Sequence, residues 1–120
     1  TLDGGTPETL RATSYAVANG QYFGGGMWVA PDASVDDGRF SITHWRDYGL
    51  FDFVVRSQGI YSGKHVTWDR TRRTTATTVR IEAADEATAA RPVVAETDGE
   101  LVGRFPLEAK LLAGILLFRA

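Results

Sequence analysis

Apolar and polar side chains alternate along several short stretches of this chain, a pattern typical of half-buried β-strands. Residues 40–45 and 74–83 show it most clearly, and in the second stretch Val79 and Ile81 face one side with polar residues between them. Further strands are expected over residues 10–18, 22–30, 92–97, 101–105 and 113–119. Glycine-containing turns separate these stretches at short, regular intervals, which favours an antiparallel sandwich or barrel.

One segment has helical periodicity instead. Its recurring apolar positions are Leu50, Phe53 and Val54, and the apolar face is broadened by Phe51 and Val55. This spacing predicts a helix over residues 46–58, ending near Gly59. Residues 85–91 are rich in alanine and predict a loop with at most one helical turn. The expected fold is therefore mostly β: one domain over residues 1–120, an antiparallel β-sandwich with one or two short helices.

The whole-chain totals exclude several classes of function. The chain has 120 residues and a net charge of −2, so it has no global positive field that would attract nucleic acid. It has no cysteine, which excludes disulfides and thiolate chemistry. No apolar run reaches the roughly 18 residues that a membrane span needs. The chain begins at Thr1 and its single methionine is Met27, so we expect it to be a piece of a longer protein.

Residues 19–40, which read NGQYFGGGMWVAPDASVDDGRF, form the most unusual stretch. Three adjacent glycines, Gly24, Gly25 and Gly26, are costly to order because glycine loses the most backbone freedom on folding. Either the backbone there needs a bulge or close packing, or bare backbone must face a cleft where a substrate lies. The glycines do not match a phosphate-binding fingerprint.

Two acidic motifs are candidates for chemistry. Asp98 and Glu100 lie two apart, so on extended backbone both carboxylates would point to one side, where mutual repulsion can tune one of them to accept a proton. Asp36 and Asp37 lie in a tight loop whose carboxylate and carbonyl oxygens suit a hard cation such as Mg²⁺. Each motif is also a common turn signal without any chemical role.

The remaining candidates are weaker. The two histidines, His44 and His65, have no metal-ligand spacing and are expected to be structural or exposed. A basic cluster consists of Lys64, His65, Arg70, Arg72 and Arg73. It predicts either a solvated face or a surface that is drawn to an anionic membrane.

Residues 19–40, read together with Asp98-Gly99-Glu100, resemble the C-terminal domain of the bacterial-type diacylglycerol kinase and sphingosine kinase-like lipid kinases. The resemblance implies that Glu100 is the general base and that Asp98 is an accompanying acidic residue. It also implies a Mg²⁺ site formed by the Asp37 carboxylate and the main-chain carbonyls of Ser34 and Arg39. The substrate-contacting residues that it suggests are Gly24, Gly25, Gly26, Leu50, Phe53 and Val54.

In that family the ATP site belongs mainly to an N-terminal α/β domain with a Gly-Gly-Asp-Gly-Thr motif, which this sequence lacks. The resemblance therefore implies a parent enzyme that transfers the γ-phosphoryl group of ATP to the hydroxyl of diacylglycerol or a sphingoid-type lipid. The isolated chain is expected to be inactive. Its expected partners are its own N-terminal domain, the lipid substrate and, transiently, the inner face of the cytoplasmic membrane; the sequence leaves open whether it forms a homodimer.

Two other interpretations remain open. The first is a non-catalytic β-sandwich binding module, because a fold of this class does not fix function. Its contact patch would use the exposed members among Tyr22, Trp28, Trp45 and Trp68. The second is a kinase relative that has lost activity and acts as a regulator.

Overall fold

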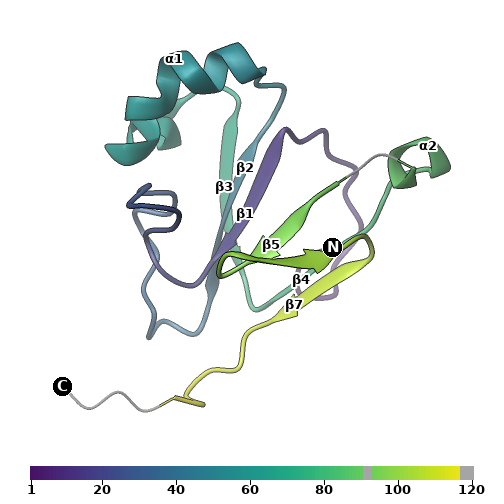
Figure 1. Ribbon diagram of the computed structural model, residues 1–120. Helices are drawn as coiled ribbons and strands as arrows, with labels where there is room; N and C mark the ends of the chain where they lie inside the picture. The colour runs from purple at the N-terminus through teal and green to yellow at the C-terminus, as the bar shows by residue number, and fades with distance from the viewer. Residues whose placement is uncertain (91–92, 117–120) are drawn as a thin grey trace.

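The computed structural model describes residues 1–90 and 93–116, except for the side chains of Leu50 and Phe53. Most of its regular structure consists of short strands in antiparallel sheets (Figure 1). The elements in chain order are β1 (Ser14–Ala18), β2 (Phe40–Trp45), α1 (Leu50–Tyr61), the 3-10 helix η1 (Lys64–Thr67), β3 (Thr71–Ala76), β4 (Thr78–Ile81), α2 (Glu86–Ala89), β5 (Ala95–Thr97), β6 (Glu100–Gly103) and β7 (Leu107–Lys110).

The central sheet has the order β1-β2-β3, with both neighbours antiparallel to β2. Five of the six residues of β2 are buried, so both faces of this strand are covered. The register places Ile42 between Val17 and Thr74, and it places Thr43 between Ala16 and Arg73. Because successive side chains point to opposite faces, β2 contributes to two separate hydrophobic clusters.

The first cluster, the β4-side core, forms where β3 leads directly into β4. Ile42, Ala76 and Val79 are its fully covered members. Asp3 stabilises the corner between the two strands, because its Oδ1 accepts hydrogen bonds from the backbone N–H groups of Thr77 and Thr78 at 2.8 and 2.9 Å. A hydrogen bond from the Thr77 hydroxyl, together with these two backbone bonds, holds the pKa of Asp3 below its ordinary value.

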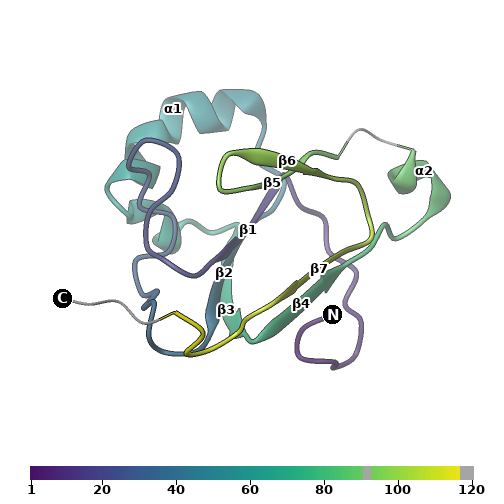
Figure 2. The same ribbon diagram turned by 60° about the horizontal axis from the view of Figure 1, so that its bottom comes forward.

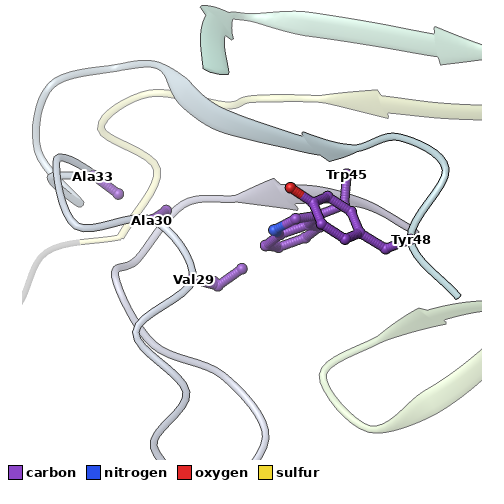
Figure 3. Close-up of a cluster of buried hydrophobic side chains, with 5 residues drawn as sticks. All are labelled: Val29, Ala30, Ala33, Trp45 and Tyr48. Carbon is purple, nitrogen blue, oxygen red and sulfur yellow. The ribbon is translucent and has the colours of Figure 1, made fainter. Parts of the chain in front are cut away.

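The second cluster, the loop-side core, lies on the other face of the central sheet. Its buried members are Val29, Ala30, Ala33, Trp45 and Tyr48. Figure 3 shows Val29 pointing toward the rings of Trp45 and Tyr48, with both alanines farther along the same loop. The hydroxyl of Thr43 on β2 donates to the carbonyl of Val29 at 3.0 Å, so the loop before β2 is tied to the sheet that it covers.

The remaining strands form two-stranded sheets. β4 pairs with β7, and β5 pairs with β6, in both cases antiparallel. Figures 1 and 2 show the β4–β7 pair crossing beyond the end of the central sheet. All four residues of β6 are exposed. The expectation of a mostly β, antiparallel sandwich with short helices is confirmed at the level of architecture.

The predicted helix is present, but it begins and ends later than expected. The side chain of Asp52 accepts a hydrogen bond from the Gly49 N–H at 2.9 Å, and this contact fixes the helix start at Leu50. The helix continues past Gly59 to Tyr61. Gly59 serves close packing instead of ending the helix, because a side chain at that position would lie 2.7 Å from the Trp68 ring.

Two of the expected strands are wrong. Residues 22–30 form a tight loop with a single bridge between Phe23 and Met27. Of the expected strand over residues 113–119, residues 113–116 contain a turn, and residues 117–119 lie outside the described part of the chain. The last strand among the described residues is β7, in which Leu107 and Ala109 alternate with charged residues. The segment that follows is more apolar and therefore predicts a strand more strongly from sequence alone.

The other predictions differ from the structure in detail. The strand expected over residues 74–83 is divided at Thr77, where the chain passes from one sheet to another. The single helical turn expected within residues 85–91 is confirmed as α2, which Asp85 caps by accepting from the Thr88 N–H at 2.7 Å.

Candidate functional site

Asp98 and Gly99 form the turn of the β5–β6 hairpin. Their φ angles are +49° and +87°, the left-handed values that a two-residue hairpin turn requires. Glu100 is the first residue of β6 and lies opposite Thr97. Because Asp98 belongs to the turn, the alternation of an extended strand does not relate its side chain to that of Glu100.

The end of this hairpin is open on the described molecule. Asp98, Gly99 and Glu100 are all exposed, and a side chain built at Gly99 would meet nothing within 4 Å. The neighbouring Leu101 is 76% exposed. A ligand or another domain therefore has free access to the Glu100 carboxylate.

Residues 34–39 form a compact turn before β2. The Asp37 N–H donates to the carbonyl of Ser34 at 3.4 Å, and Asp37 Oδ1 accepts from the Arg39 N–H at 2.8 Å. The turn thus gathers the Asp37 carboxylate with main-chain groups of Ser34 and Arg39, and Gly38 supplies the left-handed backbone that it needs, with φ of +69°.

The donor set of this turn fits a hard divalent cation. Carboxylate and carbonyl oxygens are the ligands that Mg²⁺ prefers. The charge of Arg39 is directed elsewhere, since its Nη1 lies 3.5 Å from the Thr75 hydroxyl on β3. Within residues 1–90 and 93–116, no group of three or more His, Cys, Asp or Glu side chains forms a metal site, so a cation here would depend on the single carboxylate together with carbonyls and water.

The three adjacent glycines close a loop between Phe23 and Met27. The two residues exchange backbone hydrogen bonds of 3.1 and 3.0 Å, and the φ angles of Gly24, Gly25 and Gly26 are +48°, +72° and +96°. Positive φ at three successive positions explains why all three are glycine. Side chains built at Gly25 and Gly26 would meet nothing within 4 Å, so bare backbone is exposed at this loop tip.

Of the predicted pocket wall on α1, one side chain is described. Val54 is 66% exposed, whereas the side chains of Leu50 and Phe53 lie outside what the structure describes. Two hollows of about 140 and 490 Å³ lie instead between the N-terminal segment and strands β2 and β3. Neither is lined by Glu100, Asp37 or the three glycines.

The two hollows form one groove that the sequence did not reveal. Four residues line both parts: Glu8, Leu10, His44 and Arg72. Arg72 and Glu8 are joined by an ion pair of 2.6 Å, which neutralises the charge in the centre of the groove. The segment before β1 has a turn signal at Asp3-Gly4 but no regular periodicity, so nothing in the sequence places it beside β2 and β3.

The basic cluster does not form a continuous free surface. Arg73 pairs with Asp32, and Arg70 lies 3.9 Å from Asp52 with its guanidinium 4.4 Å from the centre of the Tyr48 ring. Together with the pair between Arg72 and Glu8, these contacts occupy all three arginines of the cluster. Lys64 is exposed at the start of η1.

His65, the remaining member of that cluster, is a core residue with 0% exposure. Its Nε2 lies 3.0 Å from the Val29 carbonyl, and its ring contacts those of Trp45 and Trp68. Burial lowers the pKa of His65 below the ordinary value of 6.5, and the hydrogen bond to Val29 opposes only part of that shift. The expectation of a structural role is confirmed.

Comparison with known proteins places these features in a family. A family model described as "YegS C-terminal NAD kinase beta sandwich-like domain" matches residues 1–118. Among curated proteins, none matches the chain. None of the helices in the described residues is long and apolar enough to cross a membrane. Since the match covers almost the whole sequence, this chain belongs to the YegS C-terminal family, and it is a β-sandwich-like domain of a kinase family.

Proposed function

We propose that this chain is the acceptor-side domain of an ATP-dependent lipid kinase, with Glu100 as the general base. One observation carries the proposal: in a kinase-family domain, the Asp-Gly-Glu motif forms a hairpin end whose glutamate is exposed and unobstructed. A base that serves a substrate held between two domains must be accessible from outside its own domain.

In the proposed reaction, the Glu100 carboxylate accepts the proton of the lipid hydroxyl as its oxygen attacks the γ-phosphorus of ATP. The new oxygen–phosphorus bond forms while the bond to the β-phosphate oxygen breaks, and ADP leaves with its electron pair. Such reactions depend chiefly on positioning and charge stabilisation, so the division of work between two domains is chemically reasonable. A separate nucleotide-binding domain would hold the ATP.

The turn over residues 34–39 is the proposed Mg²⁺ site. The Asp37 carboxylate and the carbonyls of Ser34 and Arg39 would hold the ion, which would supply compensation for negative charge. Three main-chain and side-chain contacts already fix this turn, so its oxygens are positioned before a cation binds. The exposed glycine loop and three residues of α1, Leu50, Phe53 and Val54, are further proposed contacts for substrate.

The test of this proposal is Glu100→Gln in the full-length protein. The amide retains the size of the side chain but cannot accept the proton, so we expect turnover of lipid with labelled ATP to fall by about 10² to 10⁴-fold. Circular dichroism and the thermal midpoint should stay unchanged because the side chain is exposed. Near wild-type turnover in this variant would refute the assignment.

Glu96→Gln is the matched control. Glu96 is an exposed glutamate on the other strand of the same hairpin. It has no proposed role, so its substitution should leave turnover within about twofold of the wild-type rate. An equal loss in both variants would indicate a general effect of charge on the hairpin instead of a proton acceptor at position 100.

A binding module remains the second candidate, and one contact favours it. The exposed ring of Tyr22 stacks on Trp28 with centroids 5.8 Å apart, as in an aromatic contact platform. Trp45 is 3% exposed and cannot take part. Lipid turnover by the full-length protein would decide for the kinase, while complete inactivity together with ligand binding that depends on Tyr22 would decide for the module.

A further inference from the structure

Asn19 is the single asparagine of the chain, and Gly20 follows it directly. The pair lies just after β1, in a bend that leads into the loop covering the loop-side core. Asn19 is exposed, and its side-chain amide forms no hydrogen bond within residues 1–90 and 93–116. Neither residue has a positive φ, so the pair is not held in a left-handed hairpin turn. No hydrogen bond therefore holds the amide away from the peptide bond that follows it.

The peptide nitrogen of Gly20 is placed to react with that amide. In the described part of the chain, its N–H donates to no backbone carbonyl. Glycine has no side chain that would obstruct the approach of this nitrogen to Asn19 Cγ, and its backbone is the most adaptable of all residues. A side chain built at Gly20 would have Val35 Cγ1 as its nearest neighbour, at 3.9 Å, so the surroundings leave room for the movement as well.

Three Asp-Gly pairs of the chain could close the same ring by loss of water, but they are poorer candidates. Aspartate is ionised at neutral pH, and an ionised carboxylate is a weak electrophile. Asp3 Oδ1 accepts hydrogen bonds from two N–H groups and a hydroxyl, and Asp37 Oδ1 accepts one from the Arg39 N–H. Asp98 is held in the hairpin turn with φ of +49°. Asn19 is therefore the residue at which the reaction meets the least resistance.

We propose that Asn19 is a site of spontaneous deamidation in the folded protein, with water as the co-reactant. The Gly20 nitrogen loses its proton to solvent and attacks Asn19 Cγ. The new nitrogen–carbon bond forms while the bond from Cγ to the amide nitrogen breaks, and ammonia leaves with that electron pair and a proton. Water then opens the succinimide ring at one of its two carbonyls, which gives aspartate or isoaspartate. Asparagine is among the thermolabile residues of proteins.

The isoaspartate product alters the main chain beside Gln21, a residue that anchors the loop over the core. Gln21 Nε2 donates to the Ala33 carbonyl, and Gln21 Oε1 accepts from Trp28 Nε1, both at 3.1 Å. The Gln21 carbonyl accepts from the Ala30 N–H, also at 3.1 Å. Isoaspartate adds a carbon atom to the main chain and a negative charge at position 19, so it should weaken these bonds. This inference does not rest on the proposed kinase activity.

The test is incubation of the full-length protein at mildly alkaline pH, beside a peptide with the sequence of residues 14–24. Peptide mapping follows the segment that contains Asn19, whose mass rises by about 1 Da on conversion, and an isoaspartyl-specific methyltransferase labels the isoaspartate product. Because exposed segments open at almost no cost in free energy, the folded protein should convert within about threefold of the peptide rate. Conversion far slower than in the peptide would overturn the inference.

The decisive variant is Gly20→Ala, and the matched control is Gly99→Ala. The methyl group at position 20 obstructs ring closure, whereas the free space there and the ordinary φ should leave the fold intact. Gly20→Ala should convert about tenfold more slowly or less. Gly99→Ala changes a glycine away from this site and should leave the rate at Asn19 unchanged. Equal rates in the two variants would contradict attack by the Gly20 nitrogen.

Asn19→Asp separates the effect of charge from the effect of the altered main chain. This variant carries the new charge without the additional main-chain carbon, so its thermal midpoint should match that of the wild type. The purified isoaspartate form should unfold at a lower temperature, because the anchoring bonds of Gln21 are weakened. Equal midpoints for the wild type and the isoaspartate form would refute the expected loosening of the loop.

Discussion

The central sheet and the β5–β6 hairpin are both antiparallel, but only the sheet buries its side chains. Ile42, in the middle of β2, is 1% exposed, whereas Leu101, in β6, is 76% exposed. The central strand β2 is covered on both faces by segments of this chain, while every residue of β6 is exposed. An isolated two-stranded hairpin is marginally stable in water, so the hairpin needs contacts with neighbouring segments more than the central sheet does.

The same contrast separates structural from proposed chemical roles. His65 and Thr43, polar residues of the buried half, are hydrogen-bonded to the Val29 carbonyl and serve the fold. Glu100, on the open hairpin, is accessible instead. The residues that hold this domain together are therefore different from those that are proposed to act on a substrate, and the two sets can be perturbed independently.

The largest expected difference lies between Ile42→Ala and Leu101→Ala. Removing the buried Ile42 side chain leaves a cavity in the β4-side core and should lower the free energy of unfolding by about 2–5 kcal/mol. Leu101→Ala should change it by no more than about 0.5 kcal/mol, because that side chain is already in water. Chemical denaturation of both variants measures the difference. A large cost for Leu101→Ala would mean that the hairpin is covered in solution.

A second pair compares two glycines that both have positive φ. Gly63 has φ of +72°, and a side chain there would lie 2.8 Å from the Trp28 ring; Gly99 has φ of +87° with nothing within 4 Å. Gly63→Ala combines backbone strain with overpacking and should cost about 2–4 kcal/mol. Gly99→Ala carries the strain alone and should cost about 1–2 kcal/mol. Equal thermal midpoints for the two variants would contradict the close packing around Trp28.

The free energy of unfolding should also decrease as the pH falls, because His65 is buried. The pKa of His65 is lowered by burial, so below 6.5 the unfolded chain binds a proton that the folded chain resists. The contribution of His65 is thus complete above pH 6.5 and is lost as the pH falls from there toward its folded pKa. Urea midpoints measured across this range should decline in the wild type.

One variant identifies the group responsible for this decline. His65→Gln should be less stable at neutral pH, but its stability should depend much less on pH. A decline that stays unchanged in this variant would assign it to another group.

Asp3 affects stability over a separate, more acidic pH range. Because its pKa is lowered from 3.8, its stabilising effect is present above pH 3.8 and is lost only as the pH falls through the still lower folded value.

A modest effect on stability is expected for Asp37→Ala, in the turn that precedes β2. Loss of the bond between its carboxylate and the Arg39 N–H should cost about 0.5–1.5 kcal/mol. In the full-length protein the same variant should require more Mg²⁺ for half-maximal turnover. Glu96→Ala, which removes an exposed carboxylate outside this turn, is the control for a nonspecific loss of charge. An identical Mg²⁺ response in both variants would remove Asp37 from the proposed site.

Local patterns determined much of this structure. The alternation over residues 40–45 specified β2 to the residue, and the apolar spacing around residue 54 specified a helix. Asp98-Gly99 and the three glycines specified turns because few residues adopt positive φ. The acidic motifs likewise pointed to the open hairpin and to the turn over residues 34–39, since turn chemistry depends on neighbours in the sequence.

Only the tertiary structure decided which faces are buried and which strands pair. Sequence periodicity showed that α1 has an apolar face, but not that Phe51, Val54 and Val55 are exposed, because a helix at an edge packs with whichever side meets the aromatic core around Trp68. The pairing of β4 with β7, rather than with a strand at residues 113–119, depends on contacts about 30 residues apart in the chain. Such contacts have no local signature, and the placement of His65 within the core and of the N-terminal segment beside β3 follows from them as well.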